Sequence, residues 1–210
     1  MKIIHLDSIP STQKYLLDLV KKNNFIENIA VISKIQTYGI GSRGNDWIGE
    51  SGNLFFSVAI KQDYLPKDIP LQSFSIYFSY ILKNILSSEN SNLFLKWAND
   101  FYIKDLKVGG TVTNILRNIV VVGIGLNTAN SSKFGTLNTS LSNLEIVEKY
   151  IYAIEKKKSW KDIFENYSKE FEKSRKFSTH ISGQKVSLQN AKLNFDGSIT
   201  INKTKIFSLR

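Results

Sequence analysis

Short apolar runs bounded by polar or turn-forming residues predict strands along most of this chain. Two of these runs flank Arg117-Asn118, and a two-residue connection of this kind predicts a hairpin. Because the strands of a hairpin are antiparallel, the sheet is expected to be mixed or antiparallel. The predicted strands cover residues 2–6, 28–34, 54–60, 94–97, 101–103, 111–116 and 119–124.

Apolar residues spaced three and four apart predict amphipathic helices between and after these strands. The first helix follows a turn over 8–12, with Ser11 or Thr12 as its N-cap. A longer helix is predicted over 74–85, and two more follow the polar stretch 127–143. Helices of this kind bury their apolar face against a sheet.

The pattern changes at about Ser178. Short alternating segments, 185–188 and 198–201, are interrupted by Gly183 and by Asp196-Gly197, both of which indicate turns. This texture predicts a small barrel-like β domain. We therefore divide the chain into a main domain over 1–177 and a small C-terminal domain over 178–210.

Composition limits the chemistry and the location of the protein. The chain has no cysteine, which excludes disulfides and thiolate sites, and its two histidines lie far apart in sequence. No apolar run is long enough to span a membrane, so we expect a cytoplasmic protein without membrane contacts. The net charge of +10 comes mostly from dispersed lysines, which favours a solvated surface over a nucleic-acid site.

A glycine-rich segment between two predicted strands is the first candidate binding element. Five of the 12 glycines fall between Gly39 and Gly52, which indicates close approach of backbone to a ligand. The string G-x-G-x-x-G is present, but a strand follows it where a dinucleotide fold requires a helix. A flexible hairpin loop without a ligand is the alternative. Arg43 could grip a phosphate and Trp47 could stack on a purine.

Two further segments carry polar groups at the ends of predicted strands. Within 12 residues, Lys96, Asn99, Asp100 and Lys107 supply two lysines, a carboxylate and an amide, a mixture that suits ATP and magnesium. The alternative is an ordinary hairpin turn at Asn99-Asp100. Asn127 follows a buried strand that ends in glycines; it could bind adenine or ribose, or simply terminate the strand.

Taken in order, these segments resemble the biotin protein ligase family. Its pattern is a serine-threonine pair, Q-x-x-G-R-G-R-x-G-R-x-W, S-x-x-G-N-L, K-W-P-N-D, K-x-x-G and G-I-G-I-N. Each motif alone is weak, but the ordered set is specific and spans about residues 4–130. The C-terminal sequence 206–210 is also similar to the family's I-S-L-R ending. The matching residues are Ser11-Thr12-Gln13, 36–47, 50–54, 96–100, 107–110 and 123–127.

The resemblance implies an α+β fold related to class II aminoacyl-tRNA synthetases, with a mixed sheet, flanking helices and an SH3-like C-terminal domain. It also implies a ligase that forms biotinyl-5′-AMP from biotin and ATP with Mg²⁺. The biotin would then pass to a lysine of the biotin carboxyl carrier protein of acetyl-CoA carboxylase. A homodimer is possible for such an enzyme.

The family's functional residues carry over by position. Lys107 and Arg43 are expected to act on the reacting groups, and Asp100 to bind magnesium. The residues expected to contact biotin are Ser11, Thr12, Gln36, Gly39, Gly41 and Lys107. The residues expected to contact ATP are Arg43, Trp47, Lys96, Asn99, Asp100 and Asn127.

This chain departs from the family pattern at several positions. Ile40, Ser42 and Asn45 replace three arginines, Ala98 replaces the proline, and Asn114 stands where the family has a glutamate. We therefore expect the adenylate to be held loosely. Many relatives begin with a DNA-binding winged helix, for which the position of Ser11-Thr12 leaves no room; no specific DNA binding is expected.

Two rival functions remain open at the level of sequence. Lipoate protein ligase shares the K-x-x-G lysine, but its R-R-x-S-G-G-G loop is not found here. A basic nucleic-acid-binding module without catalysis would interleave exposed aromatic and basic residues, whereas the aromatic residues here fall mainly on apolar faces.

Overall fold

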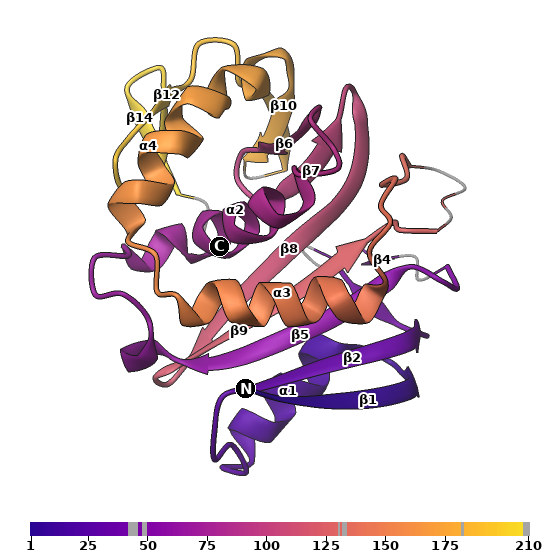
Figure 1. Cartoon of the computed structure of the whole chain (residues 1–210). Helices are drawn as coiled ribbons and strands as arrows, with labels where there is room; N and C mark the ends of the chain where they lie inside the picture. Colours follow the sequence, from indigo (N-terminus) through magenta and orange to yellow (C-terminus); the bar gives the residue numbers. More distant parts are fainter. Residues whose placement is uncertain (42–45, 48–49, 130, 132–133, 182, 208–210) are drawn as a thin grey trace.

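A computed structural model describes residues 1–41, 46–47, 50–129, 131, 134–181 and 183–207. Its centre is a seven-stranded sheet with the order β1-β2-β5-β9-β8-β7-β6 (Figure 1). Strands β1 and β2 pair in parallel and every other neighbouring pair is antiparallel, so the predicted mixed sheet is confirmed. The strands are β1 (Lys2–Ile9), β2 (Ile29–Gln36), β5 (Leu54–Lys61), β6 (Leu93–Lys96), β7 (Asp100–Ile103), β8 (Leu106–Leu116) and β9 (Ile119–Leu126).

One face of the sheet carries the larger apolar core. Helix α2 (Phe74–Leu86) packs on this face beside α3 (Asn143–Glu155) and α4 (Trp160–Glu170). The short helices η2 (Gln62–Tyr64) and η3 (Leu71–Ser73) connect β5 to α2. Alternate residues of β9 point into this core: Val120, Val122 and Ile124. Because the period of a strand is two, the residues between them must face the other side.

Helix α1 (Thr12–Lys21) covers only part of the opposite face. Its Leu16 and Val20 pack on Val31, Ala59 and Val121 in a second, smaller core. The helix begins where predicted, because the Ser11 hydroxyl accepts a hydrogen bond from the Lys14 backbone N–H at 3.3 Å. Beyond the N-terminal end of α1, no helix of the described residues packs on this face of the sheet, and the candidate site lies there.

The glycine-rich segment runs from strand to strand, as predicted. Strand β3 (Gly39–Ile40) pairs antiparallel with β4 (Asp46–Trp47), and Gly39 lies opposite Trp47. A Cβ on Gly39 would lie 2.6 Å from the Trp47 carbonyl oxygen, so only glycine fits at this position.

The small β sheets predicted for the C-terminal region are present. Strands β10 (Ser178–Ile181) and β11 (Gln184–Ser187) pair with each other, and β12 (Lys192–Leu193), β13 (Ile199–Ile201) and β14 (Thr204–Ile206) form a three-stranded sheet. Helix η4 (Phe171–Lys176) leads into them. Apolar residues from these strands share the larger core with α2 and α4. The domain boundary at 178 stays a prediction from sequence.

The turn between β12 and β13 is anchored in the main body of the protein. Three successive backbone carbonyls of this turn accept hydrogen bonds from side chains outside the C-terminal sheets. The donors are Trp160 Nε1 to Phe195 at 2.8 Å, Ser73 Oγ to Asp196 at 2.5 Å and Trp97 Nε1 to Gly197 at 2.9 Å. Trp97 belongs to the turn between β6 and β7, so the C-terminal turn supports the segment that carries Asn99 and Asp100.

Candidate active site

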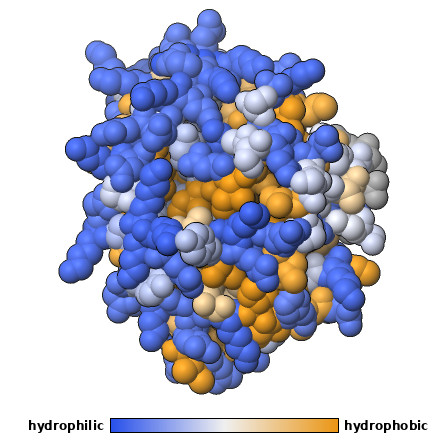
Figure 2. Space-filling model, viewed as in Figure 1, coloured by the Kyte–Doolittle hydropathy of each residue, from blue (hydrophilic) through white to orange (hydrophobic). Residues whose placement is uncertain are grey.

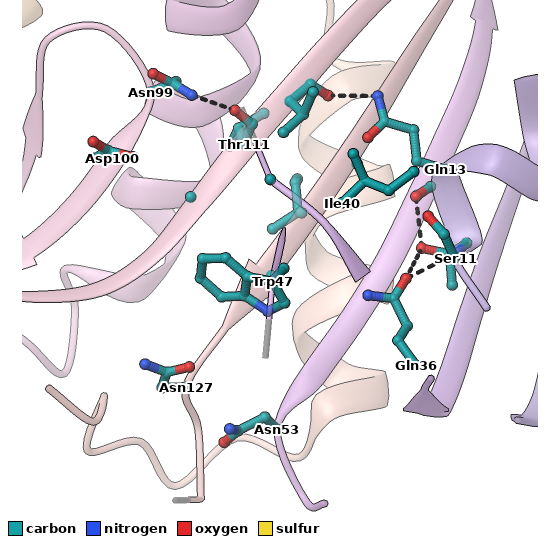
Figure 3. A pocket seen from close by; sticks show the side chains of 18 of the residues that line it. Ser11, Gln13, Gln36, Ile40, Trp47, Asn53, Asn99, Asp100, Thr111 and Asn127 are labelled. Atoms are coloured by element: carbon teal, nitrogen blue, oxygen red, sulfur yellow. Dashed lines mark hydrogen bonds between the residues drawn. The ribbon is translucent and has the colours of Figure 1, made fainter. Parts of the chain in front are cut away.

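A cavity of about 270 Å³ opens on the face of the sheet that α1 leaves uncovered (Figure 3). Its lining residues come from α1, from strands β2, β3, β4, β5, β7, β8 and β9, from the turn before β7 and from the segments around Gly41 and Asn127. They are Ser11, Thr12, Gln13, Gln36, Ile40, Gly41, Trp47, Glu50, Asn53, Ser57, Asn99, Asp100, Lys107, Gly110, Thr111, Val112, Gly123, Ile124, Gly125, Asn127, Ser131 and Phe134.

Glycines form the floor of this cavity. Gly123 and Gly125 on β9 fall on the face away from the larger core, and Gly110 of β8 pairs with Gly125. A Cβ on Gly123 would lie 2.6 Å from Gln13 Oε1, and a Cβ on Gly125 would lie 2.6 Å from the Trp47 ring. The G-I-G sequence therefore hollows the sheet so that other side chains can lie flat on it.

One end of the cavity is a hydrogen-bonded group around the start of α1. Gln36 Oε1 accepts from the Thr12 backbone N–H at 2.8 Å and from the Thr12 hydroxyl at 3.0 Å. The Thr12 hydroxyl also lies 2.8 Å from Ser57 Oγ. These contacts fix the Gln36 amide with its nitrogen as the remaining donor. Ser11, Thr12 and Gln36, which were expected to contact biotin, thus line the same end of the cavity. Figure 3 shows Ser11 and Gln36 close together there.

The other end of the cavity contains a carboxylate shared by two lysines. Lys107 Nζ lies 2.6 Å from Asp100 Oδ1, and Lys96 Nζ lies 3.6 Å from Asp100 Oδ2. Burial by itself raises the pKa of Asp100, but the two ammonium groups outweigh it and hold this pKa below its ordinary value. Asp100 is therefore a carboxylate at neutral pH and a poor proton acceptor.

Lys96 and Lys107 occupy different positions relative to the cavity. Lys107 lines the cavity, whereas Lys96 lies outside its lining residues. The Lys96 ammonium sits 5.4 Å from the ring centre of Tyr102 and 5.9 Å from that of Phe177, with Asp100 between it and Lys107. Lys96 is thus placed to hold Asp100, and a direct contact with ATP stays a prediction from sequence.

Trp47 lies across the middle of the cavity. Its ring rests on the backbone of Gly125, and Lys107 Nζ is 5.7 Å from the ring centre. Within the described part of the chain, the buried Trp47 Nε1 has no hydrogen-bond partner. Gly41 also lines the cavity, while Gly39 lies beneath Trp47. Arg43, Ser42 and Asn45 lie outside the described residues.

Three asparagines hold the segments around the cavity. Asn99 Nδ2 donates to the Thr111 carbonyl at 2.5 Å, and Asn127 Nδ2 donates to the Gly135 carbonyl at 3.0 Å. Asn53 Oδ1 accepts from the Ala129 backbone N–H at 3.0 Å. Asn99 and Asn127 therefore serve the local structure, as the alternative interpretations held, and line the cavity as well (Figure 3).

The donor set does not fit a metal held by the protein alone. Among the described residues no group of three histidine, aspartate or glutamate side chains could hold an ion. Asp100, the expected magnesium ligand, already has an ammonium group at each oxygen, and a divalent cation there would meet two positive charges.

Several lining residues carried no role in the sequence interpretation. Gln13 follows the Ser-Thr pair, and its proximity to that motif was a usable signal. Ser57 is a polar residue within an apolar strand, and its pairing with Gly123 across β5 and β9 puts it on the cavity face. Phe134 gave no signal, because it reaches the cavity only through the path of its loop, and Ile40 was marked only as a departure from a family arginine.

Comparison with known proteins identifies the family. The model of the Biotin/lipoate A/B protein ligase family matches residues 5–128, more than half of the chain. The chain belongs to this family. The membership expected from the ordered motifs is therefore confirmed. Among the described residues, no helix is long and apolar enough to cross a membrane.

Individual family members agree in sequence and in structure. The human biotin–protein ligase is 28% identical over 141 residues, which are 62% of this chain and 19% of the human protein. The bifunctional ligase/repressor BirA of Escherichia coli is 28% identical over 131 residues, 59% of this chain and 40% of its own length. The chain thus spans less than half of these relatives.

A solved structure matches over nearly the whole chain. Biotin acetyl coenzyme A carboxylase synthetase from Helicobacter pylori, solved with bound biotinylated ATP, is 38% identical with a TM-score of 0.94. The match covers 98% of this chain and 99% of that one. The predicted fold, a mixed sheet with flanking helices and small C-terminal β sheets, is confirmed by this likeness.

Proposed function

We propose that this protein joins biotin to ATP, forming biotinyl-5′-AMP, and transfers the biotin to a lysine of a carrier protein. The single observation that carries this proposal is the cavity itself. It joins an end of oriented amides and hydroxyls to an end with a lysine–aspartate pair, across one hollowed sheet. The likeness to the Helicobacter pylori enzyme, which was solved with biotinylated ATP, supports it.

Biotin would occupy the end of the cavity near α1. Its ring would meet Ser11, Thr12 and Gln36 there, and Gly41 lines the same cavity, while a contact with Gly39 stays a prediction from sequence. Its carboxylate would extend toward Lys107, which lies in the same cavity. A ligand of this length needs the floor cleared by Gly123 and Gly125, because a side chain at either position would displace Gln13 or Trp47.

ATP would occupy the end near Asp100. Trp47 offers a ring face to stack on, and the Asn127 side-chain oxygen is available as an acceptor because its nitrogen is committed to Gly135. Asn99 lines the same end, and the family pattern adds Arg43 to the phosphate contacts. Lys96 would act through Asp100, which it helps to keep ionised.

In the first step, a biotin carboxylate oxygen attacks the α-phosphorus of ATP and pyrophosphate leaves. Negative charge increases on the phosphate oxygens as the new bond forms. Lys107, with a quarter of its side chain exposed, is positioned by Asp100 at 2.6 Å to stabilise that charge. Holding both substrates in one cavity lowers the activation barrier further, because the reaction becomes effectively intramolecular.

In the second step, the carrier lysine amine attacks the acyl carbon of biotinyl-5′-AMP, and AMP leaves. The lysine loses a proton to give a neutral amide. Asp100 is unsuited to accept that proton, because its pKa is lowered by two lysines. We propose that water takes it, and that the enzyme contributes the position of the activated acyl group.

Magnesium would enter with the nucleotide. The lysine pair around Asp100 does not suit a metal held by side chains, whereas the phosphates of ATP bind Mg²⁺ directly. No step above requires a metal ligand from the protein.

The acceptor we propose is the biotin carboxyl carrier protein of acetyl-CoA carboxylase. The net charge of +10 favours encounter with an acidic partner. Any DNA binding is expected to be non-specific and to disappear as salt rises. A homodimer stays a prediction from the family resemblance.

The test is a measurement of pyrophosphate release with ATP, Mg²⁺ and biotin, lipoate or octanoate in parallel reactions. We expect release with biotin and transfer of labelled biotin to a carrier domain. Release with lipoate or octanoate in preference to biotin would overturn the proposal and favour lipoate ligation.

A further inference from the structure

We infer that Gln13 is a further substrate-contacting residue, which selects a cyclic urea through a hydrogen bond from a ring N–H to its side-chain oxygen. This inference rests on the proposed function, because it names the group on the substrate that one wall of the same cavity recognises. It begins from a side chain that is 5% exposed and lines the cavity between α1 and the sheet.

The contacts of Gln13 fix which way its amide points. Gln13 Nε2 donates to Asn114 Oδ1 at 2.7 Å and to the Val112 backbone carbonyl at 3.3 Å. A backbone carbonyl can only accept, so the nitrogen must be on that side and the oxygen on the other. Turning the amide over would place two oxygens against each other at Val112. Gln13 therefore presents an acceptor (Figure 3).

The missing side chain of Gly123 leaves the space that the Gln13 side-chain oxygen occupies. An added Cβ at Gly123 would lie 2.6 Å from Gln13 Oε1 and 3.0 Å from Gln13 Cβ. The Gln13 side chain thus fills the volume that any other residue at 123 would occupy. Its oxygen lies over Gly123 on the cavity floor, and the hydrogen bonds from Nε2 to Asn114 and Val112 hold the amide in place, so the acceptor is rigid before a ligand arrives.

Gln36, at the same end of the cavity, is oriented in the opposite sense. Both hydrogen bonds from Thr12 reach Gln36 Oε1, so the Gln36 nitrogen is the atom left to donate. The two glutamines flank the start of α1 (Figure 3). One therefore presents an acceptor and the other a donor, and each orientation is set by groups that are not part of the ligand.

A ring urea matches this arrangement, because it carries N–H donors and a carbonyl acceptor within one small planar group. A dithiolane or a plain acyl chain has neither, so its binding would leave the Gln13 oxygen and the Gln36 nitrogen desolvated without partners. Sites built to hydrogen-bond a polar group reject analogues that lack it, because buried polar groups lose their partners. Gln13 is on this basis a determinant of specificity between biotin and lipoate.

The test measures the dissociation constants of biotin, its two mono-N-methyl ureido derivatives and octanoate by calorimetry. The proteins are the wild type, Gln13→Met and the control Gln189→Met. Methionine keeps the length of the side chain and removes its acceptor. Gln189 is exposed and does not line the cavity, so the control makes the same exchange outside the site. Circular dichroism and thermal melting establish that each variant is folded.

We expect Gln13→Met to weaken biotin binding about tenfold, the value of one hydrogen bond to a neutral group. Octanoate binding should change by less than about twofold, since octanoate makes no such bond. In the wild type, methylation at one ring nitrogen should weaken binding, and this penalty should shrink about tenfold in Gln13→Met. Gln189→Met should match the wild type throughout.

Unchanged biotin affinity in Gln13→Met would overturn the inference while leaving the proposed function intact. A methylation penalty that is the same in wild type and variant would also overturn it, because another group would then receive the N–H. A wild-type protein that binds biotin no better than octanoate would instead refute the proposed function, and the inference with it.

Discussion

Gly197 offers a direct test of how the C-terminal turn is held. Its φ is +75°, a backbone conformation that costs alanine about 1 kcal/mol or more relative to glycine. An added Cβ would also lie 2.6 Å from Ser73 Oγ and 3.0 Å from Ile76 Cδ1. The Gly197→Ala variant therefore combines backbone strain with a steric clash.

Moving Ser73 away from the added Cβ would relieve the clash but would also destabilise the fold. The Ser73 hydroxyl donates to the Asp196 carbonyl at 2.5 Å, and moving it breaks that bond. Overpacking of this kind typically costs 1–3 kcal/mol, and a lost hydrogen bond about 1 kcal/mol. Together with the strain, we expect Gly197→Ala to lower the free energy of unfolding by about 3 kcal/mol.

Gly183 supplies the matched control. Its φ is +82°, but among the described residues beyond its chain neighbours an added Cβ would meet no atom within 4 Å. Gly183→Ala should therefore cost only the backbone strain of about 1 kcal/mol. For a chain of this size, about 1 kcal/mol shifts Tm by roughly 2–4 °C, so the two variants should separate by roughly 4–8 °C.

The assay is thermal and urea unfolding of both variants, followed by circular dichroism. Equal destabilisation by the two substitutions would refute the reasoning, because it would mean that the contacts of Gly197 with Ser73 and Ile76 add nothing to the strain. A loss of only about 1 kcal/mol of unfolding free energy in Gly197→Ala, which is the backbone strain alone, would refute the reasoning in the same way.

Three further predictions concern the active site and the C-terminal turn. Lys107→Ala should lower pyrophosphate release about 10²–10³-fold without unfolding the protein. The control Lys14→Ala, at an exposed position, should leave pyrophosphate release unchanged. Near wild-type release from folded Lys107→Ala would refute the assigned role. Burial raises the pKa of Asp196, but hydrogen bonds from Lys205 and Ser198 outweigh it and lower this pKa to about 2. The ionised Asp196 carboxylate therefore stabilises the folded protein above its ordinary pKa, and this stabilisation is lost as pH falls toward 2. The stability gap between wild type and Asp196→Asn should close between about pH 4 and pH 2, and a gap that persists in acid would contradict this. Ile40→Arg should slow release of preformed biotinyl-5′-AMP about tenfold, measured with labelled biotin; an unaltered rate would show that the isoleucine does not loosen the site.

The sequence by itself determined the elements and the order of the motifs. Strand and helix periods are local, because they depend on side chains two, three or four residues apart. The strands and helices appear close to their predicted ranges, except that β8 begins at Leu106 instead of 111 and that Trp97 lies in a turn after β6. The N-cap at Ser11 and the hairpin at Arg117-Asn118 are equally local. The motif set could therefore indicate the family and the reacting groups without a structure.

Only the tertiary structure decided which side chains meet. Gln13 bonds Asn114 across 101 residues, and Trp97 bonds Gly197 across 100. Lys96 and Lys107 looked equivalent in the sequence, yet one lies behind Asp100 and the other lines the cavity. Such pairings depend on strand register, and a shift of one residue would turn each side chain to the opposite face. Register is set by the packing of the whole sheet, and no local pattern contains it.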